Sequence, residues 1–319
     1  MRVLVTGVGG FVGPWVAEAL RAKGHTVCGL GRQAPAAGLQ QAEERFRVAD
    51  ITDPAAVEAA VVDLVPDAVV HLAAWTDAAA AERAIEGAYR ANLGGTLVLL
   101  ATLRAHRPRA RFLLASSALV YGAIQQDELP VAETVPLRPT GIYGASKAAA
   151  EIATLQWGRA YDLDVVVARP FNHTGPGQRA EFVCAAIAEQ LAEIEAGRRD
   201  PVLRVGNLDP VRDFLDVRDV AAGYVALLER GRRGEVYNLC SGEGVSIAEI
   251  VALFRTLALV PVHVRSEPGR RRALDVERVV GSHARVTADT GWVPRIALRD
   301  TLQVVLDDWR RRVQAMPGR

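Results

Sequence analysis

The chain has 319 residues, of which 50% are hydrophobic and 24% are charged, and its formal net charge is +1 at pH 7. This composition is typical of a globular protein of one or two domains, and the charge gives no reason to expect nucleic acid or an anionic membrane as a partner. Neither a signal-peptide pattern nor an apolar run of membrane-spanning length is present, so we expect a cytoplasmic protein with no membrane partner.

The spacing of cysteine and histidine gives no sign of a metal centre. The three cysteines Cys28, Cys184 and Cys240 lie far apart and form no C-x-x-C pattern, and the six histidines form no H-x-x-x-H or H-E-x-x-H pattern. We therefore predict no metal site and no structural disulfide, as is usual in a reducing compartment.

In the first half of the chain, apolar strand-like runs alternate with helical stretches. The predicted strands are Val3–Thr6, Thr26–Leu30, Arg45–Val48, Ala68–Leu72, Arg111–Ala115 and Val165–Ala168. The predicted helices are Val12–Ala22, Pro54–Leu64, Asp77–Arg104 and Thr140–Tyr161. Such alternation produces right-handed crossovers and a parallel sheet covered on both faces. The expected fold class is therefore α/β, with a doubly wound parallel sheet of Rossmann type.

The second half is less regular and predicts a smaller α/β domain. Its expected elements are a helix over 180–196, a strand at Val202–Val205, a helix at Val217–Arg230, a strand at Glu235–Leu239 and a helix opened by a capping box of Ser246 and Glu249. The turn Gly175-Pro176-Gly177 is the best candidate boundary. We expect residues 1–174 to bind the cofactor and 175–319 mainly to bind substrate, with segments near 206–240 returning to the first domain.

A glycine-rich segment connects the first predicted strand to the first predicted helix. It reads Thr6-Gly7-Val8-Gly9-Gly10-Phe11-Val12-Gly13. Glycines 7, 10 and 13 permit a tight turn and a close approach of the backbone to a pyrophosphate, which the amino end of the helix then faces. Because the pattern stands between a strand and a helix, it predicts a dinucleotide site that includes Gly7, Gly10, Phe11, Val12 and Gly13.

Residues after the next strands indicate which dinucleotide binds. The second strand ends in Leu30-Gly31-Arg32-Gln33, with no acid for a ribose 2′-hydroxyl and with Arg32 able to meet a 2′-phosphate. This favours NADP(H), with NAD(H) possible; the alternative is that Arg32 is a solvated surface residue. Asp50 and Ile51 are placed to meet the adenine, although Asp50 could instead cap the helix before Pro54. The cofactor contacts are expected to include Leu72, Ala73, Ala74 and Lys147.

Lys147 is one of only two lysines among 38 basic residues, and it follows Tyr143 by four positions. Residues at i and i+4 share a helix face, so the ammonium is expected to lie beside the phenol and to lower its pKa. Ser117 follows a strand that should end at the cofactor crevice, where its hydroxyl can hydrogen-bond a substrate oxygen. Ser117, Tyr143 and Lys147 thus form a candidate catalytic set for alcohol/ketone interconversion by hydride transfer.

The glycine turn, the Ser117-x-x-x-Tyr121-Gly122 segment and Tyr143-x-x-x-Lys147, in this order, resemble the extended short-chain dehydrogenase/reductases that act on nucleotide sugars. The resemblance implies that Tyr143 is the acid/base, that Lys147 binds the nicotinamide ribose and that Ser117 orients the reacting oxygen. Dehydratases of this superfamily carry an acid pair directly after the Ser/Thr. Here Ala118 and Leu119 stand at those positions, so we predict that the chain does not dehydrate.

Four further segments resemble the GDP-4-keto-6-deoxy-mannose reductases. They are Arg169-Pro170-Phe171-Asn172-His173-Thr174-Gly175-Pro176-Gly177-Gln178, Arg212–Val217, Val236–Gly242 and Gly281–Arg285. The resemblance implies that Asn172 and Arg212 contact the nucleotide diphosphate, and that Arg272 has the same role. Glu277, in the same stretch as Arg272, is also assigned to the substrate site. Arginine clusters are the usual bidentate partners of phosphate groups.

The favoured function is NADPH-dependent reduction of the C4 ketone of GDP-4-keto-6-deoxy-D-mannose to GDP-D-rhamnose. A sugar-nucleotide 4-epimerase with tightly held NAD is the alternative. A GDP-mannose 4,6-dehydratase and a non-catalytic binding protein are less favoured, the latter remaining open because fold alone does not imply function. The related enzymes pair two long helices into an intersubunit four-helix bundle. Ala-rich helices at 78–104 and around Tyr143 and Lys147 predict a homodimer of this kind.

Overall fold

The computed structural model describes residues 1–33, 45–267 and 277–316. Its larger sheet has seven strands, all parallel, in the order β10-β6-β5-β4-β1-β2-β3. The strands are β1 (Arg2–Thr6), β2 (Thr26–Gly31), β3 (Arg45–Val48), β4 (Ala68–His71), β5 (Arg111–Ala115), β6 (Val165–Pro170) and β10 (Val236–Leu239). The strand order reverses direction between β1 and β4, which places a ligand crevice at the carboxyl ends of these two strands.

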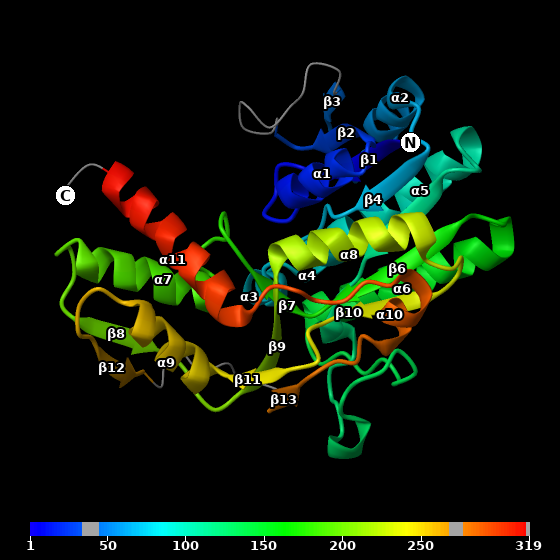
Figure 1. The fold of residues 1–319 in the computed structure, drawn as a ribbon. Coiled ribbons are helices and arrows are strands. Elements are labelled where there is room, and N and C mark those ends of the chain that lie inside the picture. Colours follow the sequence, from blue (N-terminus) through cyan, green and yellow to red (C-terminus); the bar gives the residue numbers. More distant parts are fainter. Residues whose placement is uncertain (34–44, 268–276, 317–319) are drawn as a thin grey trace.

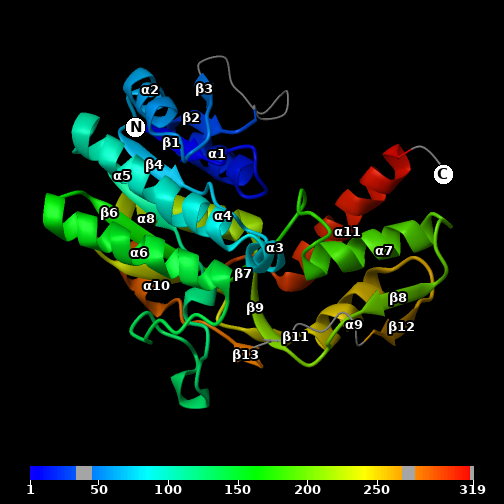
Figure 2. The ribbon, with the colours of Figure 1, turned by 180° about the vertical axis from the view of Figure 1, so that it is seen from behind.

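Helices cover both faces of this sheet, so the fold class predicted from the sequence is confirmed. One face carries α1 (Gly13–Ala22), α8 (Val217–Arg230) and α10 (Ala284–Thr290), and the other carries α2 (Pro54–Leu64), α5 (Gly95–His106) and α6 (Ile142–Tyr161). Figure 1 shows α1 and α8 in front of the sheet, and Figure 2 shows α5 and α6 from behind. The central strands are buried on both sides because each face packs against its own apolar layer.

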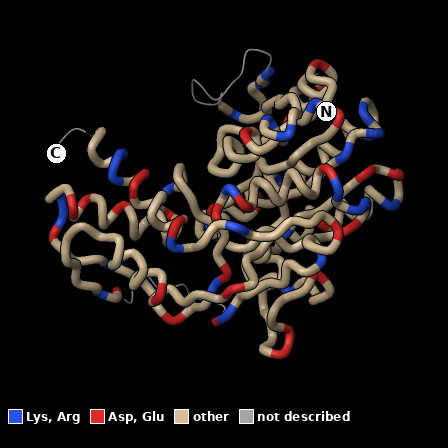
Figure 3. Tube along the Cα trace, viewed as in Figure 1, with Lys and Arg blue, Asp and Glu red and all other residues tan. Residues whose placement is uncertain are grey.

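The remaining elements build a second, smaller lobe. Its strands are β7 (Asn172–Thr174), β8 (Val202–Val205), β9 (Val211–Asp216), β11 (Gly244–Ser246), β12 (His263–Ser266) and β13 (Arg278–Val279). Its helices are α7 (Val183–Glu195), α9 (Ile247–Leu257) and α11 (Leu298–Ala315), which share an apolar core. The lobe projects beside the carboxyl end of the large sheet (Figure 1), and basic and acidic residues are interspersed over both lobes (Figure 3).

The prediction of one continuous helix over Asp77–Arg104 is wrong. The chain forms α3 (Ala78–Arg83), α4 (Ile85–Tyr89), a π-helical turn (Arg90–Gly94) and then α5. The π-turn places the Asn92 side chain against two other segments: its amide oxygen accepts from the backbone N–H of Trp75 at 2.7 Å, and its amide nitrogen donates to Ser146 Oγ at 2.8 Å. Local widening of a helix often occurs at functional sites, and here it joins the end of β4 to the helix that carries Tyr143.

Short helical turns complete the described chain. The 3-10 turns are Ala118–Val120 and Gln126–Glu128. The capping box predicted at Ser246 is confirmed: Glu249 N–H donates to Ser246 Oγ at 3.1 Å, and the Ser246 N–H donates to the Glu249 carboxylate at 2.8 Å. Two orphan N–H groups are thereby satisfied at the start of α9.

Candidate active site

The glycine turn is closed tightly against the end of β4. Gly7 has a φ of 71°, and a Cβ built on it would lie 2.9 Å from the backbone nitrogen of Ala73. A Cβ on Gly13 would lie 2.4 Å from the carbonyl oxygen of Val8. Only glycine fits at both positions, and the turn therefore brings the backbone of 72–73 to the amino end of α1. That end has no side-chain cap and no acid in its first turn, as an anion-binding helix terminus requires.

The structure brings Ser117, Tyr143 and Lys147 together at the carboxyl end of β5. Tyr143 and Lys147 lie on successive turns of α6, and the Ser117 hydroxyl is near enough to the Tyr143 phenol to act on its pKa. Lys147 is 4% exposed, and its Nζ donates to the carbonyl oxygen of Ala115 at 2.6 Å. A buried ammonium needs such an acceptor, and the bond fixes its position beneath the crevice.

The predicted pKa shift of Tyr143 is wrong in direction. Burial raises the pKa of the Tyr143 phenol to about 12, although the interaction with Ser117 acts in the opposite sense. Burial also lowers the pKa of Lys147 to about 8. Desolvation disfavours the charged form of each group, and the sequence shows the i, i+4 pairing but not this burial. A phenol that keeps its proton suits a proton donor, which is the role needed when a ketone is reduced.

Arg32 lies at the end of β2 and is exposed. The pKa of Asp50 is lowered, mainly because Thr52 donates hydrogen bonds to its carboxylate. The positive charges of Arg32 and Arg90 lower it further. Asp50 does not cap α2; the side chain of Asp53 does so. The structure thus brings Arg32 and Asp50 into one electrostatic neighbourhood after β2 and β3. Of the two roles predicted for Asp50, the helix cap is wrong.

The other residues predicted for the cofactor lie around the same crevice. Ile51 is buried and packs closely against Gly95 of α5: a Cβ built on Gly95 would lie only 2.6 Å from the Ile51 side chain. The N–H of Ala73 donates to Thr6 Oγ1 at 3.2 Å, which ties the segment after β4 to the glycine turn. Leu72 and Ala74 flank Ala73 in that segment. The crevice is therefore bordered by segments after β1, β2, β3 and β4.

Three of the four additional substrate residues lie in the second lobe's sheet region. Asn172 is exposed on β7 and pairs with Phe214 of β9. Arg212 lies two residues earlier on β9, and its Nη1 donates to the backbone oxygen of Glu277 at 3.4 Å. Asn172, Arg212 and Glu277 are thus carried by neighbouring strands or their ends. Arg272 lies outside the described residues.

Two contacts at the crevice were not predicted from the sequence. The His173 ring stacks on the Phe11 ring, with centroids 6.0 Å apart and planes 5° apart. Asn92 is 2% exposed and joins Trp75 to Ser146, whose hydroxyl donates to the Tyr143 carbonyl at 2.8 Å. Asn92 is a polar residue inside an Ala-rich helical stretch, and this feature of the sequence could have indicated that its side chain has a specific contact. No comparable signal marked the stacking of Phe11 on His173.

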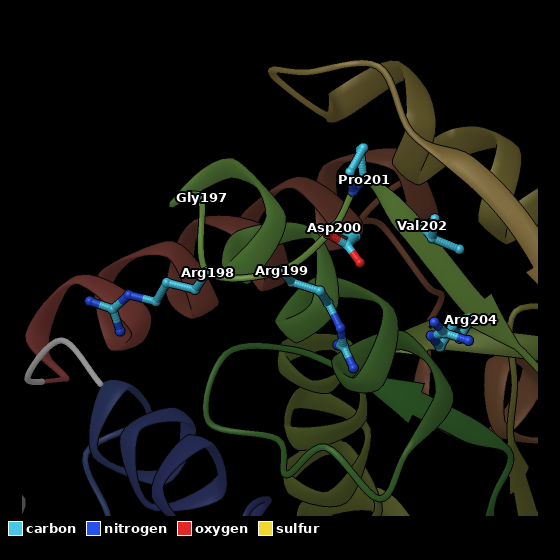
Figure 4. A pocket seen from close by; sticks show the side chains of 7 residues that line it. All are labelled: Gly197, Arg198, Arg199, Asp200, Pro201, Val202 and Arg204. Carbon is cyan, nitrogen blue, oxygen red and sulfur yellow. The ribbon is translucent and has the colours of Figure 1, made fainter.

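A separate hollow of about 540 Å³ lies at the turn between α7 and β8 (Figure 4). Its lining consists of Gly197, Arg198, Arg199, Asp200, Pro201, Val202 and Arg204. The three arginine side chains point in different directions in Figure 4. Arg199 donates to the Glu193 carboxylate at 3.1 Å, and Arg204 donates to the Glu267 carboxylate at 2.7 Å. Because none of the proposed catalytic groups lines this hollow, we assign the chemistry to the crevice.

The described parts of the chain hold neither a metal cluster nor a membrane-spanning helix. Residues 1–33, 45–267 and 277–316 contain no group of three or more His, Cys, Asp or Glu side chains arranged to hold a metal ion. Within the same residues, none of the helices combines the length and the apolarity needed to cross a bilayer. The three cysteines are buried, and none forms a disulfide.

Comparison with known proteins identifies the family. Residues 3–240 match the model of the NAD dependent epimerase/dehydratase family. The chain is 41% identical over 313 residues to the GDP-6-deoxy-D-mannose reductase of Pseudomonas aeruginosa, covering 98% of each chain. It is also 28% identical over 324 residues to a UDP-glucose 4-epimerase of Corynebacterium glutamicum, covering 97% of this chain and 95% of that one.

Solved structures give the same result. The structure of RMD from Pseudomonas aeruginosa complexed with NADPH superposes with a TM-score of 0.85 at 38% identity, covering 98% of this chain and 99% of that one. The UDP-glucose 4-epimerase of Thermus thermophilus in complex with NAD superposes with a TM-score of 0.87 at 30% identity, covering 97% and 99%. The glycine turn, the Ser117/Tyr143/Lys147 set and these similarities agree, and the chain belongs to the NAD dependent epimerase/dehydratase family, the extended short-chain dehydrogenase/reductases that act on nucleotide sugars.

Proposed function

We propose that the protein reduces the C4 ketone of GDP-4-keto-6-deoxy-D-mannose to GDP-D-rhamnose with NADPH. The observation that carries the reaction type is the phenol of Tyr143, which keeps its proton and interacts with the Ser117 hydroxyl, one helical turn from the buried Lys147. The substrate follows from the 41% identity to the GDP-6-deoxy-D-mannose reductase of Pseudomonas aeruginosa over 98% of both chains.

The residues around the glycine turn fit a dinucleotide. At Gly7 a Cβ would collide with the backbone of Ala73, so the turn stays tight, and the amino end of α1 is free of a capping side chain. Gly10, Phe11, Val12 and Gly13 complete the turn that would hold the pyrophosphate. Arg32 would meet a 2′-phosphate, which favours NADP(H) over NAD(H). The reductase structure from Pseudomonas aeruginosa contains NADPH, in agreement with this preference.

Each catalytic side chain has a separate part in the reaction. Bound NADPH supplies the hydride for C4. Tyr143 donates its phenolic proton to the oxygen of the former ketone, and the Ser117 hydroxyl holds that oxygen within reach of the phenol. Lys147 would bind the nicotinamide ribose, and the hydrogen bond from its Nζ to the Ala115 carbonyl at 2.6 Å holds the ammonium in place.

The residues after Ser117 argue against dehydration. Ala118 is buried and Leu119 is 44% exposed beside the catalytic hydroxyl. Neither side chain can move a proton, whereas elimination across C5 and C6 needs a base and an acid that each contribute about 10²–10⁴-fold. The chain is therefore proposed to use the 6-deoxy ketone and not to make it.

The two lobes are proposed to divide the binding. The first, residues 1–174 without β7 and with segments of 206–240, would bind NADP(H), and the second, β7 and mainly 175–319, would bind the GDP-sugar. Asn172, Arg212, Arg272 and Glu277 are the proposed substrate contacts. Asn172, Arg212 and Glu277 come from adjacent strands or their ends, as a shared ligand requires.

A cytoplasmic homodimer is the proposed state of the protein. Three buried thiols without a disulfide suit a reducing compartment. Exposed or half-buried apolar side chains occur on α4, the π-helical turn, α5 and α6: Ile85, Leu93, Leu97, Ile152, Leu155 and Trp157, of which Leu155 and Trp157 also pack against the core. Two copies could cover this surface by packing these helices into a four-helix bundle.

The test uses purified protein and freshly made GDP-4-keto-6-deoxy-D-mannose. We expect loss of NADPH absorbance at 340 nm, with GDP-D-rhamnose identified by NMR. Protein that keeps NAD through purification and interconverts UDP-glucose and UDP-galactose without added cofactor would instead be a 4-epimerase, the function of the Thermus thermophilus neighbour. A protein that binds the dinucleotide but converts neither substrate would contradict both assignments.

A further inference from the structure

Helix α6 carries a third buried polar group in line with Tyr143 and Lys147. Glu151 follows Lys147 by four residues, so all three side chains project from the same face of the helix. Glu151 is 1% exposed, and the proton transfer proposed above does not use it. An ionised carboxylate so deeply buried is costly unless it is paired and hydrogen-bonded, so its partners define what it does.

The three groups of α6 bind three consecutive residues at the end of β5. Lys147 Nζ donates to the Ala115 carbonyl at 2.6 Å, and Ser116 Oγ donates to the Glu151 carboxylate at 2.7 Å. The Tyr143 phenol interacts with the next hydroxyl along the chain, that of Ser117, which acts to lower the pKa of the phenol. Glu151 is therefore the third attachment between this helix and the strand end that presents the catalytic hydroxyl.

Arg169 of β6 extends the attachment to the far side of the Ser117 segment. Its Nε lies 3.1 and 3.2 Å from the two carboxylate oxygens of Glu151, and its Nη2 also contacts that carboxylate. Its Nη1 donates to the Tyr121 hydroxyl at 2.8 Å, and its guanidinium lies 4.7 Å from the centre of the Tyr121 ring. The pair thus holds both Ser116 and Tyr121, one residue before Ser117 and four residues after it.

A buried Arg–Glu pair is weak evidence for stability, because well-packed apolar residues often replace such pairs without loss. Its geometry indicates a different role here. We propose that Glu151 is a positioning residue, acting through Ser116 and Arg169 to set the place of the Ser117 hydroxyl relative to Tyr143 and Lys147. This positioning role rests on the proposed function in one respect: its effect on kcat is measured in the reduction of the keto-sugar.

The first test is Ser116→Ala, which removes one attachment and leaves the Glu151–Arg169 pair intact. We expect kcat to fall about tenfold, since a small misplacement of a reacting group is sufficient for such a loss. KM, NADPH affinity and melting temperature should stay close to wild type, and Ser116→Thr, which keeps a hydroxyl, should recover most of kcat. A kcat for Ser116→Ala within about twofold of wild type would overturn the proposal.

The second test compares the buried Arg169–Glu151 pair with the partly buried Arg310–Glu195 pair. Glu151→Gln should lower kcat by a larger factor than it raises KM. Glu195→Gln breaks the Arg310–Glu195 pair of the second lobe, and it should lower the melting temperature by a similar amount but leave kcat unchanged. Equal kcat values for the two variants would assign Glu151 to stability alone. If Glu151→Gln does not fold, Ser116→Ala and Ser116→Thr still decide the question.

A third measurement does not need turnover. In protein with ¹³C-labelled tyrosine, the Tyr143 ring signal, identified by its loss in Tyr143→Phe, should move in Ser116→Ala in the direction seen for Ser117→Ala. An unmoved signal would overturn the positioning role. If the wild type does not reduce the keto-sugar, the proposed function fails, while the NMR comparison still tests Glu151.

Discussion

The His173 ring lies flat against the Phe11 ring, with a centroid distance of 6.0 Å. Phe11 belongs to the glycine turn and His173 to β7, whose neighbouring strand β9 carries Arg212. This contact joins the proposed dinucleotide turn directly to the first residues of the second lobe. Because both segments border one crevice, a cofactor and a sugar nucleotide bound there would meet near the end of β5, where Ser117 and Tyr143 lie.

Tyr143→Phe should abolish turnover because it removes the proton donor and leaves the ring in place. The expected loss in kcat is about 10²–10⁴-fold, with NADPH affinity, measured by fluorescence titration, close to wild type. Tyr161→Phe changes an exposed phenol on the same helix and is the matched control. Reduction of the keto-sugar by Tyr143→Phe at the wild-type rate would remove the phenol from the mechanism.

Lys147→Arg should also be severe, although the chain uses arginine for nearly all its other cations. Lys147 is 4% exposed with its Nζ on the Ala115 carbonyl, and the wider planar guanidinium does not fit that position. We expect less than about a tenth of wild-type kcat/KM. Lys23→Arg, at the other lysine, serves as the control and should be neutral. Near-normal activity of Lys147→Arg would contradict the ribose contact.

The activity of the wild type should depend on pH through Lys147. Its pKa is lowered to about 8 by burial, while that of Tyr143 is raised to about 12 by burial. As pH rises through 8, Lys147 loses its charge first and Tyr143 still keeps its proton. We therefore expect kcat/KM to decrease above about pH 8 in a profile from pH 6 to 10, with circular dichroism checking that the protein stays folded. A profile flat to pH 10 would show that the charge of Lys147 is not needed.

Arg32→Ala should weaken NADPH far more than NADH, because only the 2′-phosphate loses its partner. A charge-assisted hydrogen bond contributes roughly 1.5–3 kcal/mol, so the affinity ratio should change about 10- to 100-fold. Arg47→Ala, which removes a surface partner of Asp63, is the control. An unchanged ratio of NADPH to NADH affinity in Arg32→Ala would make Arg32 a solvated surface residue.

Ile152→Glu should shift the protein toward monomer in sedimentation velocity at micromolar concentration. Ile152 is 58% exposed on α6, within the apolar surface proposed for the dimer. A carboxylate there would have to be desolvated on association. Val62→Glu alters a residue of α2 that is 52% exposed and should leave association unchanged. A wild type that already sediments as a monomer would exclude this interface.

His71 should make the protein sensitive to mild acid. It is 2% exposed, its Nδ1 lies 2.7 Å from Thr6 Oγ1, and burial, with a smaller effect of Lys147, lowers its pKa to about 3. The unfolded chain takes up a proton near pH 6.5 and the native state does not, so stability is complete above 6.5 and decreases below it. At pH 5 the expected loss is about 2 kcal/mol.

Urea unfolding at pH 7.5 and pH 5 measures this loss, and His71→Gln should be less stable at pH 7.5 but show a smaller decrease on acidification. His263→Gln changes a surface residue and should behave as wild type. An equal decrease in wild type and His71→Gln would assign the acid sensitivity to other groups.

Much of the fold could be predicted from the sequence where local signals and tertiary packing agree. The bounds of α2 and α8 match the prediction, because Asp53 and Asp216 cap them and apolar faces continue to their ends. The stretch 77–104 was predicted as one helix because its alanines favour helix throughout. Its actual breaks depend on Asn92 reaching Trp75 and Ser146, partners that are distant in sequence.

The site was predictable to the extent that its motifs are local. The spacing of Tyr143 and Lys147 predicted that both lie on one helix, as they do in α6, but the burial of these groups, and hence the direction of the Tyr143 pKa shift, depends on the whole fold. Glu151 continued the same spacing and was overlooked, since its partners Ser116 and Arg169 come from two different strands. A polar residue that continues a catalytic i, i+4 series is therefore a signal worth following.

The edge strand β10 has a consequence for synthesis of the chain. Its neighbour β6 ends at Pro170, whereas β10 begins only at Val236, after β7, β8, β9 and α8 have been made. On the ribosome, the nascent sheet therefore exposes the hydrogen-bonding groups of β6 while the intervening segments emerge. Unpaired strand edges promote aggregation. We therefore expect that β6 needs to be shielded, for example by a chaperone, until residues 236–239 arrive.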